Sequence, residues 1–146
     1  MNDVGKDTGQ VLQGESPAPK HKLILVVDDE VDILNMFAML LTVHGFRPIT
    51  APSAQEALIF LNTERPDVIV SDCMMPNMDG IAFCAAVRTL PLHQNTPFIL
   101  MSAAPERHIL AMLNYDAFLR KPFPFDLLRE MLERFTRPTN SADRTI

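Results

Sequence analysis

The sequence has few cysteines, no long hydrophobic run and no signal peptide, and each shortage excludes a class of protein. Its only two cysteines, Cys73 and Cys84, cannot build a disulfide framework and lack zinc-ligand spacing. The longest aliphatic run is Leu23–Val27, whereas a membrane-spanning helix needs about 20 apolar residues. The start, MNDVGKDTGQ, lacks the basic and then apolar organisation of a signal peptide. We therefore expect a cytoplasmic protein that is not inserted in a membrane.

Basic residues are also in the minority. The chain of 146 residues has 13 basic and 18 acidic residues, and residues 23–135 alone hold eight basic and 14 acidic side chains, a net charge of −6. Because nucleic-acid binding needs clustered Lys and Arg, we expect no direct contact with nucleic acid. The chain is 47% hydrophobic, enough for the core of one compact domain. Six acids lie in two short stretches: Asp28, Asp29, Glu30, Asp32, Asp72 and Asp79.

Short apolar runs alternate with stretches of helical periodicity. Leu23–Val27 is typical of a strand buried on both faces of a parallel sheet. The apolar spacing that follows it predicts a helix that ends near Gly45, and Ser53 is the expected N-cap of the next helix. Further strands are predicted at 47–50, 67–71, 98–101 and 117–119, and further helices at 81–88, 106–113 and 125–135.

Five strands that alternate with five helices predict an α/β fold, a doubly wound parallel sheet with right-handed crossovers. Residues 1–21 and 137–146 lack apolar periodicity, and we expect flexible tails there that flank one domain over 22–136. About ten tail residues cannot fold into an output domain.

Polar side chains follow four of the predicted strands. Asp28 and Asp29 follow the first strand, Asp72 the third, Ser102 the fourth, and Lys121 comes just after the fifth. Because doubly wound sheets bind ligands beyond the carboxyl ends of their strands, we expect these side chains to meet. Three carboxylates repel one another unless a cation intervenes, and Mg²⁺ is a hard ion that prefers oxygen ligands. The pattern predicts a site for a phosphoryl group beside Mg²⁺.

Four segments, ILVVDDE, VIVSDCMMPNMDG, ILMSAA and FLRKPF, resemble the receiver domain of two-component response regulators of the single-domain, chemotaxis type. The resemblance covers about residues 22–136. It implies a flavodoxin-like sheet with strand order 2-1-3-4-5. It also implies that Asp72 accepts a phosphoryl group from a phosphohistidine on a sensor histidine kinase. Lys121 would then pair with the phosphoryl group, and the peptide bond between Lys121 and Pro122 would be cis.

The resemblance also implies a metal site and a switch. Asp29, Asp72 and the backbone carbonyl of Met74 would ligate Mg²⁺, with Asp28 acting mainly through water. After phosphorylation the Ser102 hydroxyl would move toward the phosphoryl oxygens and Phe118 would rotate into the vacated space. The surface of the fourth helix, fifth strand and fifth helix would then present a changed face to a downstream protein.

The chain departs from the family pattern in three places. The stretch from Ser102 to Lys121 is shorter than usual, so we expect a short fourth helix, and Asn114 stands where Gly is usual. Phe118 lacks the hydroxyl of the more common Tyr. Met74 and Ala104 are both apolar, and we hypothesise that they hinder attacking water and lengthen the life of the aspartyl phosphate.

The leading interpretation is a phosphoacceptor rather than a multiple-turnover enzyme, and two alternatives stay open. A phosphate shuttle to a histidine phosphotransfer protein fits the sequence equally well. A constitutive scaffold fits less well because the acid pair and Lys121 are intact. A phosphatase with an aspartate nucleophile is disfavoured, because such an enzyme needs an acid at Met74.

Other residues are expected to be structural. Asp32 and Asp79 are candidates for helix capping. The methionines at helical spacing are expected to pack in the core: Met36, Met39, Met112 and Met131. The histidines share no ligand spacing and are expected in surface or capping roles: His21, His44, His93 and His108.

Overall fold

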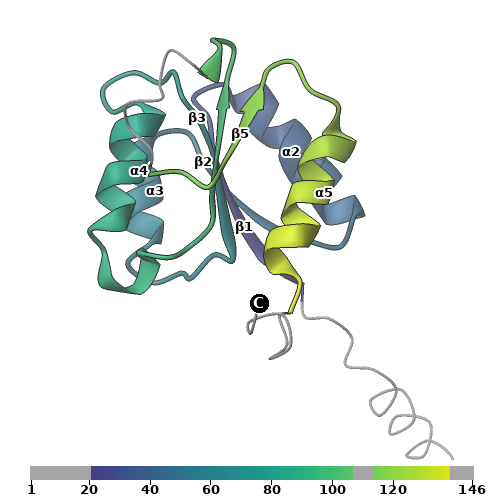
Figure 1. Ribbon diagram of the computed structural model, residues 1–146, viewed down its shortest axis with the longest axis horizontal. Coiled ribbons are helices and arrows are strands. Elements are labelled where there is room, and N and C mark those ends of the chain that lie inside the picture. The colour runs from purple at the N-terminus through teal and green to yellow at the C-terminus, as the bar shows by residue number, and fades with distance from the viewer. Residues whose placement is uncertain (1–20, 107–113, 139–146) are drawn as a thin grey trace, which may run out of the picture.

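A five-stranded parallel sheet forms the centre of the computed structural model, which describes residues 21–106 and 114–138 (Figure 1). Its strands run in the order β2-β1-β3-β4-β5, as predicted. Every pair of neighbouring strands is parallel, so all the carboxyl ends lie at one edge of the sheet. The strands are β1 (Leu23–Val27), β2 (Arg47–Ala51), β3 (Val68–Asp72), β4 (Phe98–Ser102) and β5 (Ala117–Arg120).

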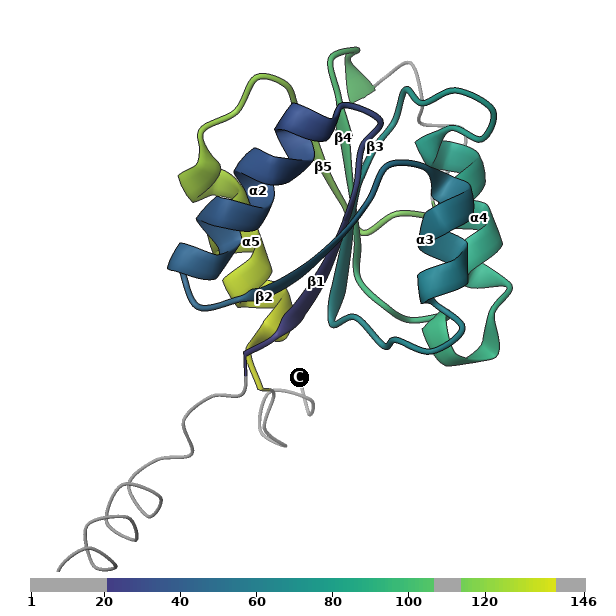
Figure 2. The same ribbon diagram turned by 180° about the vertical axis from the view of Figure 1, so that it is seen from behind.

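Helices cover both faces of this sheet, which confirms the doubly wound architecture. Helices α2 (Val31–Val43) and α5 (Phe125–Thr136) lie on one face, and α3 (Ala54–Phe60) and α4 (Gly80–Arg88) lie on the other (Figure 2). A short 3-10 helix, η1 (Pro91–His93), was not predicted. The helix expected over 106–113 lies outside the described residues, as do almost all of both tails. Among the described residues, no helix has the length and hydrophobicity that a bilayer crossing requires.

The central strands bury both of their faces. In β1, Leu25 and Val27 point into the core under α3 and α4, whereas Ile24 and Val26 point into the core under α2 and α5. All five residues of β3 are buried too. This two-sided burial explains why the strands are continuous apolar runs, and it holds the carboxyl ends of β1 and β3 rigidly side by side.

Capping groups set the ends of the helices. Ser53 Oγ accepts a hydrogen bond from Glu56 N at 3.1 Å, and an Asp79 carboxylate oxygen accepts one from Ala82 N at 2.8 Å, so these two predicted N-caps are confirmed. The capping role expected of Asp32 was wrong, because Glu30 is the N-cap of α2 and Asp32 lies within its first turn. Gly45 follows α2 with a φ of 90°, a conformation that glycine adopts without steric cost. The turn at Gly45 sends the chain directly into β2.

An arginine fixes the beginnings of β4 and β5. Arg88 Nη2 lies 2.8 Å from Asp116 Oδ2, and the guanidinium also donates to Thr96 O at 2.7 Å and to Asn114 O at 3.0 Å. The same Asp116 oxygen accepts from Phe98 N at 2.8 Å. These bonds join α4 to the start of both strands, at the end of the sheet opposite the predicted site.

The expectations for His93, Met36 and Met39 were wrong. His93 is buried, with Nε2 2.9 Å from Leu61 O, because η1 folds it beneath the end of α3. Met36 and Met39 do not pack in the core: the side of α2 that carries them faces away from the sheet, and Met39 is 65% exposed. His44, in contrast, has the expected capping role, since Nδ1 lies 2.9 Å from Leu40 O.

Gly80 supplies a test of how closely α4 packs on the end of β3. Its N donates to Cys73 O at 2.8 Å, and a Cβ at this position would collide with the backbone of Asp72 and Cys73. Alanine favours helices by about 1 kcal/mol over glycine, but overpacking costs about 1–3 kcal/mol. Because the collision is with backbone atoms, the upper part of the overpacking range applies, and we expect Gly80→Ala to lower the free energy of unfolding by about 1–2 kcal/mol in urea titrations. The exposed change Gln55→Ala in α3 should stay within about 0.5 kcal/mol of wild type. A Gly80→Ala protein as stable as wild type would contradict the contact.

Candidate functional site

Three carboxylates meet at the carboxyl edge of the sheet, as predicted. Asp28 and Asp29 follow β1, and Asp72 is the last residue of the neighbouring strand β3. Each of the three offers a carboxylate oxygen within 4.8 Å of the others. Asp28 is fully buried, Asp72 is 7% exposed and Asp29 is exposed. The cluster therefore opens to solvent on the side of Asp29.

Asp28 shapes the turn between β1 and α2. Its Oδ1 accepts a hydrogen bond from Glu30 N at 2.9 Å, and its own N donates to Ala51 O at 3.2 Å. These bonds keep the buried carboxylate at the base of the cluster and leave Oδ2 facing Lys121.

Lys121 enters the cluster from the end of β5. Its N donates to Ser102 O at 2.8 Å, which places the residue beside the end of β4, and its peptide bond to Pro122 is cis, as expected. Lys121 Nζ lies 3.0 Å from Asp72 Oδ1 and 3.5 Å from Asp28 Oδ2. Burial alone would lower the pKa of Lys121, but its hydrogen bond and attraction to Asp72 outweigh burial and raise that pKa. The ammonium stays charged between two carboxylates.

One ammonium does not neutralise the cluster. Burial raises the pKa of Asp72 above its ordinary value of 3.8, Lys121 lowers it, and repulsion from Asp28 and Asp29 adds to the rise. The donor set is therefore all oxygen with excess negative charge, which fits a hard divalent cation. Within residues 21–106 and 114–138, no hydrogen bond reaches the carbonyl oxygen of Met74, so that oxygen is also free to act as a ligand.

The two predicted switch residues lie on neighbouring strands. Ser102 is fully buried at the end of β4, and its Oγ accepts a hydrogen bond from Ala104 N at 3.0 Å. Phe118, in β5, is half-buried and packs against the core under α3 and α4. Leu100 lies between them, because it precedes Ser102 by two residues on the same strand face and pairs with Phe118.

The apolar residues beside the cluster differ in exposure. Met74, two residues after Asp72, is 68% exposed, and Ala104 is half-buried. Met74 is thus a large apolar side chain at the mouth of the site rather than part of the core.

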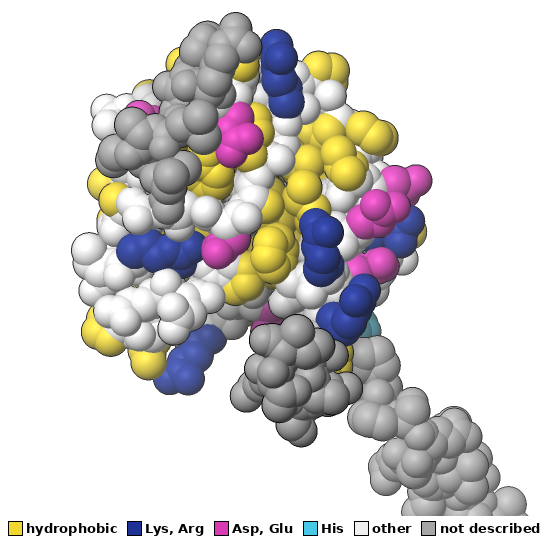
Figure 3. All heavy atoms as spheres, in the orientation of Figure 1, with side chains coloured by type: hydrophobic (Ala, Val, Ile, Leu, Met, Phe, Trp, Pro, Cys, Tyr) yellow, Lys and Arg dark blue, Asp and Glu magenta, His cyan; other side chains and the backbone are white. Residues whose placement is uncertain are grey.

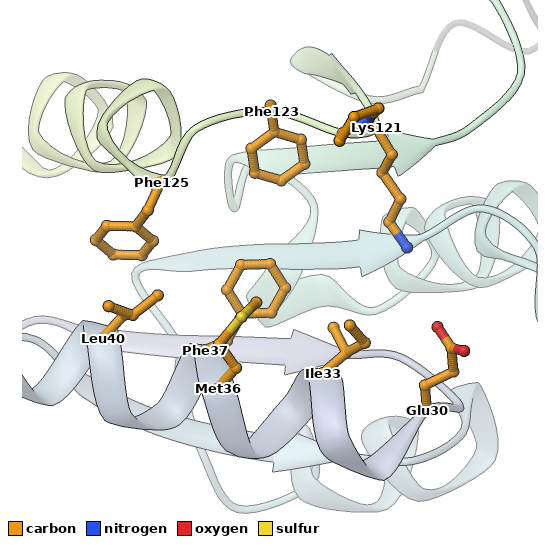
Figure 4. A pocket seen from close by; sticks show the side chains of 9 residues that line it. Glu30, Ile33, Met36, Phe37, Leu40, Lys121, Phe123 and Phe125 are labelled. Carbon is orange, nitrogen blue, oxygen red and sulfur yellow. The ribbon is translucent and has the colours of Figure 1, made fainter.

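A groove that the sequence did not predict begins at Lys121. It has a volume of 390 Å³ and runs between α2 and the segment that leads into α5. Figure 4 shows Lys121 and Glu30 at one end of the groove, with Phe37 and Phe123 facing each other across it. The apolar residues along α2, including Met36 and Leu40, are the sequence signal that could have revealed it.

The raised pKa of Asp72 predicts that its ionised carboxylate lowers stability. Because the folded chain binds the Asp72 proton more tightly than the unfolded chain, stability falls as pH rises through and above 3.8. We expect Asp72→Asn to increase the free energy of unfolding at pH 7 in Mg²⁺-free urea titrations, and the gain to vanish below pH 3.8. Added Mg²⁺ should stabilise wild type more than the variant. Asp126→Asn, at an exposed site on α5, is the control. A variant less stable than wild type at pH 7 would refute this prediction.

Known proteins share both this sequence pattern and this fold. The family model of the response regulator receiver domain matches residues 24–133. The probable chemotaxis protein CheY of Rhizobium etli is 35% identical over 114 residues, which cover 75% of this chain and 88% of that protein. The probable transcriptional regulator ycf27 of Cyanophora paradoxa is 34% identical over 131 residues, and this chain, 85% of it aligned, spans only 54% of that protein's length.

A solved structure agrees with these relatives. The response regulator TrrA from Thermotoga maritima, solved in complex with Mg²⁺ and BeF, superimposes with a TM-score of 0.71 at 30% identity, covering 78% of this chain and 98% of TrrA. The chain therefore belongs to the response regulator receiver domains of two-component signalling.

Proposed function

We propose that Asp72 accepts a phosphoryl group from a phosphohistidine on a sensor histidine kinase or a histidine phosphotransfer protein. The supporting observation is the ion pair between Lys121 Nζ and Asp72 Oδ1 at 3.0 Å, inside a cluster of three carboxylates at the end of β3. A buried but ionisable carboxylate beside a fixed ammonium is suited to act as a nucleophile and to hold the product.

The chain's own residues account for the transfer. An Asp72 oxygen attacks phosphorus, a new O–P bond forms as the N–P bond breaks, and the imidazole leaves with the electron pair of that bond. The transition state of phosphoryl transfer is loose and spreads negative charge over the phosphoryl oxygens. Lys121 supplies positive charge beside Asp72, and Asp28 holds the Lys121 ammonium from the other side.

Asp29, Asp72 and the Met74 carbonyl would hold Mg²⁺, with Asp28 acting through water. Their oxygen-only donor set and excess negative charge support this assignment. The bound ion would neutralise charge on the phosphoryl oxygens. Asp29 is exposed whereas Asp72 is buried, so the ion would enter the site from the side of Asp29.

The groove beside Lys121 supports a place for the phosphoryl donor. A protein that delivers a phosphoryl group to Asp72 must lie over the mouth of the site, and the groove leads from that mouth along α2. The nearby exposed residues of α2 are apolar, among them Met36, Met39 and Val43. We infer that the donor contacts α2 through apolar side chains, and that a downstream protein in the cytoplasm binds the β5 and α5 side after phosphorylation.

Phosphorylation can be tested with labelled acetyl phosphate and Mg²⁺. We expect one label per wild-type chain and none on Asp72→Asn. Lys121→Met should be labelled about 100-fold more slowly, as expected when a preorganised charge is removed from a transition state. Arg65→Met, which removes an exposed cation before the amino end of β3, should match wild type. An unlabelled wild type, or a labelled Asp72→Asn, would disprove the proposal, and onward transfer to a histidine phosphotransfer protein would identify a shuttle.

Met74 supplies a second test, on the lifetime of the phosphoryl group. An exposed apolar side chain two residues from Asp72 cannot hydrogen-bond an attacking water, whereas an asparagine there can. We expect Met74→Asn to lose its phosphate several-fold faster after the donor is removed, followed by release of labelled phosphate. Met36→Asn, an equal change on α2, should leave the rate unchanged. Equal rates in Met74→Asn and wild type would count against the hypothesis.

A further inference from the structure

A hydrogen bond joins the loop after β4 to a residue two positions before the start of β5. Tyr115 Oη donates to Glu106 Oε2 at 2.8 Å. Glu106 comes four residues after Ser102, and Tyr115 comes three residues before Phe118. The bond therefore ties together the two short segments that lead away from the two switch residues.

Tyr115 also packs beside Phe118. The ring centroids are 6.3 Å apart with an interplanar angle of 47°, a tilted arrangement that aromatic pairs favour. Both side chains lie partly buried against the core under α3 and α4. Strand β5 is one of the two edge strands of the sheet. Hydrophobic side chains gather on the surface where it runs between α4 and α5 (Figure 3). A rotation of Phe118 at this edge must change its contact with Tyr115.

The other end of the bond responds to Ser102. Ser102 Oγ accepts a hydrogen bond from Ala104 N at 3.0 Å, which holds the start of the loop that carries Glu106. Movement of the Ser102 side chain toward Asp72 must either pull Ala104 along or break this bond. In both cases the restraint that Ser102 places on the loop carrying Glu106 changes.

We propose that Tyr115 and Glu106 form a latch that favours the arrangement described here and opens when Asp72 is phosphorylated. This inference rests on the proposed function and adds its regulation. Tyr115 acts as a positioning residue for Phe118 and supplies, three residues earlier, the hydroxyl that Phe118 lacks. The latch connects Ser102 to Phe118 through the loop backbone at Ala104 and the side chains of Glu106 and Tyr115, and its hydrogen bond restrains Phe118 until the loop moves.

The chemistry of the two groups suits a latch. Burial and the hydrogen bond to Glu106 raise the pKa of Tyr115 to about 12, so the hydroxyl remains a donor at neutral pH. A hydrogen bond to a carboxylate is stronger than one between neutral groups, but Glu106 is exposed, which limits its strength. The bond is therefore strong enough to favour the unphosphorylated arrangement and weak enough to open after phosphorylation.

The chain carries its own optical probe of this bond. Tyr115 is the only tyrosine, and there is no tryptophan, so intrinsic fluorescence reports on this residue alone. A carboxylate that accepts a hydrogen bond from a phenol quenches its fluorescence. We expect the tyrosine fluorescence of the full wild-type chain to rise when Mg²⁺ and beryllofluoride are added together, and not with Mg²⁺ alone.

Variants of Tyr115 and Glu106 test whether the latch opposes the binding of beryllofluoride at Asp72. Opening costs less without the latch, so Tyr115→Phe and Glu106→Ala should each bind beryllofluoride about two- to tenfold more tightly by calorimetry in Mg²⁺. The double variant should show no further gain, because either change already removes the bond. Glu106→Gln keeps an oxygen acceptor and should lie between wild type and Glu106→Ala. Glu130→Ala, an equal loss of charge on exposed α5, should match wild type.

The outcomes separate the latch from the proposed function. A wild type that does not bind beryllofluoride overturns the proposed function, and the latch with it. A wild type that binds with unchanged tyrosine fluorescence overturns the latch alone. Additive gains in the double variant, or a Tyr115→Phe affinity equal to that of wild type, also overturn the latch and leave the phosphoacceptor role intact.

Discussion

The ion pair between Lys121 and Asp72 is the interaction on which the acidic edge of the sheet depends. A folded chain cannot hold three carboxylates within 4.8 Å of one another, two of them buried, without a nearby positive charge. Lys121 provides it from a backbone position fixed by its hydrogen bond to Ser102 O. The proposed nucleophile, its counter-charge and the proposed switch hydroxyl are thus held by three different strands of one rigid sheet. A change in charge at Asp72 therefore alters the electrostatic environment of Lys121, at the carboxyl ends of β4 and β5.

The two ends of β4 and β5 differ in how they are held. At the amino end, Arg88 and Asp116 join both strands to α4 with charged hydrogen bonds that lie away from Asp72. At the carboxyl end of β4, the Ser102 hydroxyl accepts a hydrogen bond from Ala104 N, and Glu106 in the loop beyond accepts one from the Tyr115 hydroxyl. Under the proposed function, a local event at Asp72 would therefore change Phe118 while the amino ends of β4 and β5 stay in place.

The sequence predicts the fold and the acidic cluster well because both follow from local patterns. Continuous apolar runs mark strands buried on both faces, and the first polar residue after each run must lie at the carboxyl edge. The groove, the buried His93 and the Arg88 network could not be predicted in this way, because each joins residues far apart in the chain with no common period. Arg88 and Asp116, for example, are 28 positions apart and meet only after β4 and β5 have paired. The link between Tyr115 and Glu106 spans only nine positions, but it too leaves no periodic pattern in the sequence.

The acidic cluster also affects the pKa of the thiol of Cys73, the residue next to Asp72. Burial raises the pKa of the Cys73 thiol, and the charges of Asp79 and Asp72 add to the rise. Burial likewise raises the pKa of Cys84 to about 11. Oxidants and electrophiles react with thiolates, which are scarce at both positions near neutral pH. The carboxylates that would draw a cation to Asp72 in the proposed function thus also help to keep the adjacent sulfur in its less reactive protonated form.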